Sequence, residues 1–538
     1  MKRPLIAVLA VLIVTAAAPA ARSQAARHPY TIPHVLRYAT GDDIAGLNPH
    51  LVSTLTLSYL SSLTMAWLVR SGPDNGPVPE LALEVPTLQN HLISPDGKTI
   101  TYRLRRGVKW SDGAPFDADD VAFSIKTVQN PANNEVGRDG WDLISKVDEP
   151  DKYTIVLHLT KRYASYAFTF FSTLGANPCI LPKHLLAGVA TINDIPYDRL
   201  PIGIGPFRYT AWRRGDSVEL EANPLYFRGR PKLDRIVFKV VPSRNTVITQ
   251  LETHELDMWL QATAAYYARA KAIPGDAVIR QPSFAYDHLD FNLTHPGVSD
   301  PAVREALRYA VDRESIREKI HFGLDPVSDN VLGPGHPDYH AIPLTPFDLA
   351  KAKAILDAAG WKPGPDGIRA KDGVRLSLVY ALASGSADAD GIVELIRQTW
   401  QQLGVAIDVR HYPPPLLFAV TSDGILASGK FDVAMYAWNL GIDGDLSGQF
   451  SCAMTPPNGQ NYLRWCDPKA EQAMQAFKLE YDAAKRKPYD FIVTDRIASQ
   501  VPTIVLDIRD FIVAYNNDLK NFHPNAVSPF DDIMNVDI

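Results

Sequence analysis

Alternating apolar and polar positions mark short strands in the first half of the chain. Apolar residues occupy every second position over residues 100–104 and again over 155–159, a period typical of strands with one buried face. Between these segments the apolar residues recur at helical spacing, and Asp117 with Asp120 has the pattern of a capping box. We therefore expect a compact, strand-rich block over about residues 76–185.

The pattern becomes helical from Asp300 onward, where apolar residues recur at steps of three and four. Predicted helices begin at Asp300, Thr345 and Asp390. The last of them ends at Leu403 and lies between strand-like segments at 374–380 and 405–409. A strand, a helix and a strand in this order predict a parallel βαβ unit with a right-handed crossover. A second α/β lobe is therefore predicted over roughly residues 290–490.

The first residues have the pattern of a secretory signal. Lys2 and Arg3 precede an apolar run over 5–18, and small residues follow as far as Ala25. The apolar run is shorter than the roughly 20 residues that a membrane-spanning helix needs. We expect residues 1–25 to be removed and, because this segment contains no cysteine, no lipid anchor. The mature protein is then expected to be soluble and periplasmic.

Composition excludes several classes of protein. In 538 residues, hydrophobic side chains make up 46% and charged ones 21%, which is ordinary globular usage. The net charge is −6 without a long basic run, so no nucleic-acid partner is expected. The short proline- and glycine-containing segment between Cys452 and Cys466 predicts a local disulfide in an oxidising compartment. Cys179 then remains as a buried thiol.

Catalytic and metal-binding motifs are scarce. The chain has neither HExxH nor GxSxG, and the phosphate-loop-like spacing at Gly424 and Gly429 has Phe431 where a Ser or Thr must contact magnesium. His336 and His340 are four residues apart, but the prolines and glycine around them are incompatible with a regular helix. We therefore expect no cofactor, no resident metal and no enzymatic activity.

A set of motifs resembles the extracellular solute-binding proteins of family 5, the dipeptide, oligopeptide and nickel-type receptors of bacterial ABC importers. They occur in the family's order and span nearly the whole chain after the signal. The matching segments are 47–50, 94–99, 104–113, 116–121, 203–207, 223–227, 303–307 and 358–361.

The resemblance implies an α/β, two-lobed, hinged fold of the Venus-flytrap type, with an additional subdomain in the first lobe. The implied division gives a discontinuous lobe 1 over residues 26–65, 200–288 and 495–538, its subdomain over 66–199, and lobe 2 over 289–494. The chain is expected to cross between the lobes near residues 286–291 and 493–501.

The resemblance also points to the ligand-binding segment. In the peptide receptors of the family, a Trp is followed three residues later by an Asp that pairs with the α-ammonium group of the peptide. Trp438 is present here, but Gly441 occupies the later position, and acids follow at Asp443 and Asp445. The predicted ligand-binding residues are Trp438, Asn439, Asp443 and Asp445. Either Asp443 takes the amine-binding role, or the ligand has no free amino terminus; core packing for the indole and a solvated turn for the acids are the alternatives.

The sequence therefore predicts a monomeric, non-enzymatic periplasmic receptor. It would capture a peptide or similar small polar solute between its lobes and present it to an ABC permease with its ATPase subunits. One alternative is a metal-chelate receptor of the nickel type, for which His336 and His340 are the only support. Another is an exported hydrolase.

Overall fold

The computed structural model describes residues 27–538, except 41, 42, 45, 53, 74, 139, 174–177, 420–422 and 526. The predicted signal, 1–25, lies outside the described residues. Within the described part of the chain, no helix has both the length and the apolar character that crossing a membrane requires.

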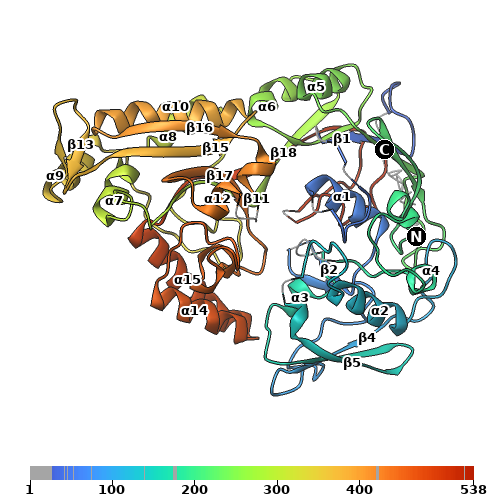
Figure 1. The fold of residues 1–538 in the computed structure, drawn as a ribbon. Helices are drawn as coiled ribbons and strands as arrows, with labels where there is room; N and C mark the ends of the chain where they lie inside the picture. Colours follow the sequence, from blue (N-terminus) through green and yellow to red (C-terminus); the bar gives the residue numbers. More distant parts are fainter. Residues whose placement is uncertain are drawn as a thin grey trace, which may run out of the picture.

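A ten-stranded mixed sheet runs through the molecule in the order β16-β15-β17-β11-β18-β10-β1-β9-β8-β7 (Figure 1). One end consists of β16 (Ala406–Tyr412), β15 (Ser377–Ala383) and β17 (Val433–Asn439). The other end consists of β10 (Met258–Ala262), β1 (Val35–Ala39), β9 (Arg235–Lys239), β8 (Ser217–Ala222) and β7 (Phe207–Arg213).

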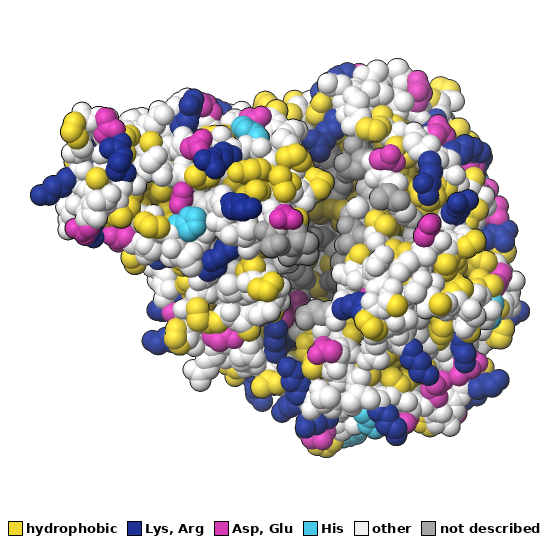
Figure 2. All heavy atoms as spheres, in the orientation of Figure 1, with side chains coloured by type: hydrophobic (Ala, Val, Ile, Leu, Met, Phe, Trp, Pro, Cys, Tyr) yellow, Lys and Arg dark blue, Asp and Glu magenta, His cyan; other side chains and the backbone are white. Residues whose placement is uncertain are grey.

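Two long antiparallel strands, β11 (Asp276–Phe291) and β18 (Thr503–Asn516), connect these ends. β11 pairs with β17 through residues 285–291, whereas β18 pairs with β10 through 512–515. The pairing of β11 with β18 shifts register twice, between Pro282 and Tyr286 and again after Asp287. Each strand therefore belongs to both halves, and Figure 2 shows the surface hollowed between those halves.

The predicted βαβ unit is confirmed, because β15 and β16 are parallel neighbours joined through α10 (Ala387–Gln402). Two predicted helix starts are wrong. α10 begins three residues before Asp390, since the Ser386 hydroxyl caps it by accepting from Ala389 N. α9 (Leu349–Ala358) begins after Thr345, because the Asp348 side chain is the acceptor that caps its first turn. α7 (Pro301–Tyr309) is capped by Asp300, as predicted.

A smaller antiparallel sheet, β4 (Thr99–Arg103), β6 (Thr154–Leu159) and β5 (Ile144–Asp151), lies within the predicted subdomain. Its helix α2 (Ala118–Gln129) begins with the predicted capping box of Asp117 and Asp120. A buried ion pair connects this block to the N-terminal segment, since His50 Nδ1 lies 2.6 Å from Glu135 Oε2. Burial alone would lower the pKa of His50, but Glu135 raises it to about 10. The exact lobe boundaries stay a prediction.

The remaining elements surround these sheets. The strands are β2 (Val69–Ser71), β3 (Pro77–Pro79), β12 (Lys362–Pro363), β13 (Arg369–Lys371) and β14 (Val374–Arg375). The helices are α1 (Leu55–Thr64), α3 (Tyr166–Thr169), α4 (Lys183–Leu186), α5 (Arg244–Glu252), α6 (Ala264–Lys271), α8 (Arg313–Lys319), α11 (Pro414–Leu417), α12 (Ile425–Ser428), α13 (Ser447–Phe450), α14 (Pro468–Leu479) and α15 (Ala483–Gln500). Short 3-10 turns lie at Trp141–Leu143, Pro196–Arg199 and Cys452–Met454.

Candidate ligand cavity

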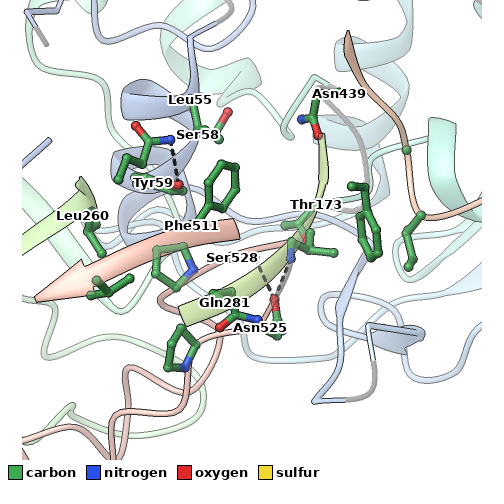
Figure 3. A pocket seen from close by; sticks show the side chains of 18 of the residues that line it. Leu55, Ser58, Tyr59, Thr173, Leu260, Gln281, Asn439, Phe511, Asn525 and Ser528 are labelled. Atoms are coloured by element: carbon green, nitrogen blue, oxygen red, sulfur yellow. Dashed lines mark hydrogen bonds between the residues drawn. The ribbon is translucent and has the colours of Figure 1, made fainter. Parts of the chain in front are cut away.

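A cavity of about 220 Å³ lies where α1, the crossing strands and the end of β17 meet. In Figure 3 the labelled side chains of α1 and Asn439 lie on opposite sides of it. Its walls comprise Leu55, Ser58 and Tyr59 from α1, Thr173, Leu260 and Gln261, Gln281 and Phe284 from β11, Phe511 and Val513 from β18, residues 439–442, and residues 524, 525 and 527–529. Segments far apart in the sequence therefore build one site.

None of the described residues that line this cavity is charged. Its polar side chains carry hydroxyl or carboxamide groups, which donate and accept neutral hydrogen bonds. An ionic ligand group buried without a compensating charge would lose several kcal/mol of hydration. The described walls therefore suit peptide groups, amides and hydroxyls.

Gln261 is placed in the wall by an irregularity at the end of β10. Its φ is 61°, and the pairing of β10 with β18 shifts register between Trp259 and Ala262. Bulges of this kind redirect side chains and occur often next to binding sites. Gln261 Nε2 donates to the Tyr59 hydroxyl at 3.1 Å. Burial raises the pKa of Tyr59 well above its ordinary value, so the phenol stays neutral.

Asn525 orders the wall formed by the C-terminal segment. Its Oδ1 accepts from Val527 N at 2.9 Å and Ser528 N at 2.7 Å, and its Nδ2 donates to Asp531 Oδ2 at 2.6 Å. Burial is the main cause that raises the pKa of Asp531 to about 7. These bonds fix the wall while leaving little of the Asn525 amide for a ligand.

Of the predicted ligand-binding residues, Asn439 lines the cavity. It is the last residue of β17, it is exposed, and its side-chain amide has no hydrogen-bond partner among the described residues. Trp438, which pairs with Tyr286 across the sheet, is half-buried and packs against two hydrophobic clusters. Trp438 is not among the residues lining the described cavity.

The chain turns away from the cavity after Ile442, so Asp443 and Asp445 do not line it. Asp443 accepts a hydrogen bond from Ser165, in the predicted subdomain. Burial, followed by the charge of Asp445, raises the pKa of Asp443 to about 6. Asp445 lies 3.6 Å from Lys478 Nζ and accepts from Ser447 N at 2.9 Å. Both acids therefore lie in a charged cluster behind the cavity, and ligand contact by either stays a prediction.

Asp490 and Asp338 complete this cluster next to Gly444. A Cβ on Gly444 would lie 2.5 Å from Asp490 Oδ2 and 2.9 Å from Asp338 Oδ2, so the loop approaches these acids closely only because it has no side chain there. Burial, followed by the charge of Asp338, raises the pKa of Asp490 to about 10. Arg486 is the cation that opposes these shifts.

The two histidines considered as metal ligands have separate partners. His336 Nε2 lies 3.2 Å from the Gly441 carbonyl oxygen, whereas His340 Nε2 lies 2.9 Å from Asp495 Oδ1. Cys452 and Cys466 form a disulfide with a Cα separation of 4.7 Å, and Cys179 is a buried free thiol. The disulfide closes the loop that follows the predicted ligand-binding segment.

Comparison with known proteins places this architecture in a family. A model of the bacterial extracellular solute-binding proteins, family 5, matches residues 76–459. The chain belongs to this family. It is 26% identical over 451 residues to the oligopeptide-binding protein AppA of Bacillus subtilis, covering 82% of this chain and 80% of the relative. The dipeptide-binding protein of Escherichia coli K12 is 27% identical over 420 residues, covering 73% of this chain and 75% of the relative.

Solved structures agree on the two-lobed solute-binding fold. AppA of Bacillus subtilis in complex with a nonapeptide has a TM-score of 0.79 at 22% identity, covering 93% of this chain and 98% of AppA. NikZ of Campylobacter jejuni in complex with Ni(L-His) has a TM-score of 0.78 at 26% identity, covering 94% of this chain and 99% of NikZ. The expected fold class is confirmed, and the chain is a solute-binding protein.

Proposed function

We propose that this protein is the exported receptor of an ABC importer, and that it captures a peptide or similar small polar solute between its lobes. The receptor then presents the solute to the membrane permease, whose ATPase subunits supply the energy. It acts as a monomer without a chemical step. The named relatives that bind oligopeptides and dipeptides favour a peptide over other solutes.

The observation that carries the proposal is the composition of the cavity wall. α1 supplies one side, the end of β17 supplies another, and both crossing strands contribute residues between them. A solute that contacts all of these segments stabilises the state in which they are close together. Binding therefore shifts the equilibrium between open and closed lobes by the difference in affinity for the two states.

The neutral wall suggests which part of a peptide is recognised. Asn439 and Gln261 line the cavity, and we propose that they hydrogen-bond main-chain peptide groups, which are the same whatever side chains the peptide carries. Gly441 supplies no carboxylate for an amino terminus. The nearest acid in sequence, Asp443, already faces Ser165 and Arg486. A peptide bound chiefly through its backbone agrees with this arrangement.

A metal chelate is the second candidate solute, because NikZ was solved with Ni(L-His). His336 and His340 have separate partners, which argues against direct coordination of such a metal by both histidines. We therefore rank a metal chelate below a peptide as the candidate solute.

Mass spectrometry of small molecules released on denaturation identifies the solute, and calorimetry with that compound measures its affinity. We expect Asn439→Ala to weaken binding about 5- to 30-fold, equivalent to about 1 to 2 kcal/mol for a lost hydrogen bond. Asn458→Ala, at an exposed loop position, is the matched control and should leave affinity unchanged. Equal affinities of both variants and the unmodified protein would contradict the placement of the site, and turnover of peptides would contradict the receptor role.

A further inference from the structure

A second polar cluster lies at the crossing strands, outside the lining of the cavity. It consists of His321 and Asp325, which follow α8, and Asp507 of β18, and all three are buried. One potential metal-ligand atom from each residue lies within 4.8 Å of the others. Within the described part of the chain, no other group of three His, Cys, Asp or Glu residues has this proximity.

The Asp507 carboxylate is incompletely satisfied. Its residue is 1% exposed, and neither of its oxygens has a hydrogen-bond partner among the described residues. His321 Nε2, which also lacks a hydrogen-bond partner there, lies 3.4 Å from Asp507 Oδ2. Unsatisfied buried carboxylates are costly, and both facing groups keep lone pairs or donors that no described residue uses.

Two carboxylates in this cluster approach one imidazole, and a third carboxylate lies beside them. Asp287 lies opposite Asp507 in the sheet and is paired with Arg509, whose Nε and Nη2 donate at 2.6 and 2.7 Å. That pair is neutral. Asp325 and Asp507 approach the two ring nitrogens of His321, and neutral imidazole is the form that binds metals. A divalent cation on Nε2 would contact the Asp507 carboxylate directly.

Hydrogen bonds from neighbouring groups already orient the side chains that could bind a metal. Asp325 Oδ2 lies 2.9 Å from His321 Nδ1, which leaves Nε2 facing Asp507, and Asp325 Oδ1 accepts from Asp510 N at 3.0 Å. A carboxylate on one imidazole nitrogen with a metal on the other is a common arrangement. Ligand atoms about 2.0 to 2.2 Å from one ion are typically about 3 to 3.5 Å apart, and the separation of His321 Nε2 from Asp507 falls in this range.

From these contacts we infer that His321 Nε2 and Asp507 form a site for a divalent cation at the crossing strands, with Asp325 orienting the imidazole through Nδ1. The mixed nitrogen and oxygen donors suit Zn²⁺ or Mn²⁺. The ion would tie the segment after α8 to β18, next to the second register shift of β11. It would act on the connection between the lobes and not on the solute cavity, so this site is independent of the proposed receptor function.

The test uses the full mature protein, stripped with a chelator and then incubated with Zn²⁺ or, separately, Mn²⁺. We expect one equivalent of metal to survive gel filtration, a higher unfolding temperature in its presence, and an anomalous diffraction peak between His321 and Asp507. His321→Gln and Asp507→Asn should each abolish retention. His411→Gln is the matched control, because His411 forms an exposed pair with Asp390 at 2.7 Å.

Unfolding of each variant without metal reports whether it folds. Asp507→Asn is expected to fold, because it removes a buried carboxylate that lacks hydrogen-bond partners. Failure of the unmodified protein to retain either ion overturns the inference. Retention that survives both ligand substitutions, or that is lost in His336→Gln instead, also overturns it.

Discussion

Asp490 gives a sharp test of the charged cluster behind the cavity. Asp490 is 2% exposed, and its Oδ2 has no hydrogen-bond partner among the described residues. Burial and the charge of Asp338 raise its pKa from 3.8 to about 10. At neutral pH the folded protein therefore holds a proton on Asp490 that the unfolded chain releases. We predict that Asp490→Asn, which mimics the protonated form, stabilises the protein.

The magnitude follows from the two pKa values. Between pH 3.8 and about 10, unfolding releases one proton, so stability falls by about 1.4 kcal/mol for each unit of rising pH. At pH 7, about three units above the unfolded value, the cost is about 4 kcal/mol. Asn at this position has no such cost, because its amide does not titrate. A gain of about 2 to 4 kcal/mol at pH 7 is expected, the lower figure allowing for imperfect hydrogen bonds.

Urea unfolding of the ligand-free protein near pH 5.5 and near pH 8.5 measures this effect. The stability difference between Asp490→Asn and the unmodified protein should grow by about 1.4 kcal/mol per pH unit between these conditions. Asp423→Asn, at an exposed position, is the control and should change neither the stability nor its pH dependence. A difference that is constant with pH, or a destabilised variant, would refute the assignment of a protonated Asp490.

Three further predictions concern other parts of the molecule. Gly441→Asp places an acid at the position where the resemblance implies an amine-binding Asp. Calorimetry should then show about tenfold tighter binding of peptides with a free amino terminus, equivalent to about 1.4 kcal/mol. Gly441→Asn should not tighten binding, and equal affinities would refute amine recognition at this position. Glu135 raises the pKa of His50 to about 10. The pair therefore contributes its full stabilisation below pH 6.5, and this stabilisation is lost as the pH rises toward 10. Glu135→Gln should cost about 3 to 5 kcal/mol at pH 6 and abolish that dependence; an unchanged urea midpoint would contradict this. Replacing Cys452 and Cys466 by Ala should lower the free energy of unfolding by about 3 kcal/mol, given their sequence separation of 14; no change would show that the disulfide does not restrain the unfolded chain.

Much of the local structure was predictable because it depends on short-range chemistry. The Asp117 capping box, the Asp300 cap and the parallel βαβ unit each depend on residues close together in sequence. The two errors in helix starts have the same origin. Ser386 and Asp348 are both suitable caps, but their neighbours at Asp390 and Thr345 carry side chains of the same kinds, so local preference alone did not distinguish them.

The cavity was much less predictable, because its walls come from segments hundreds of residues apart. Asn439 was identified through its position after Trp438, whereas Gln261 and Asn525 belong to no recognisable motif. Gln261 reaches the wall because its backbone has φ of 61° next to a register shift. No residue pattern in the sequence predicts that conformation. The direction of the chain after Ile442 was equally hidden, since residues 443–445 fit an exposed turn as well as a buried cluster.

The position of the acids has a consequence for ligand selection. A carboxylate in the cavity would favour solutes with an amino group and disfavour others, because an unpaired buried charge costs several kcal/mol. Here the described cavity wall is neutral, and Asp443 is held behind it with Ser165 and Arg486. Hydrogen bonds to main-chain groups discriminate weakly between side chains, whereas the size of the cavity limits length and bulk. We therefore propose selection by shape and by neutral hydrogen bonds, and the response to Gly441→Asp measures how far one charge can change it.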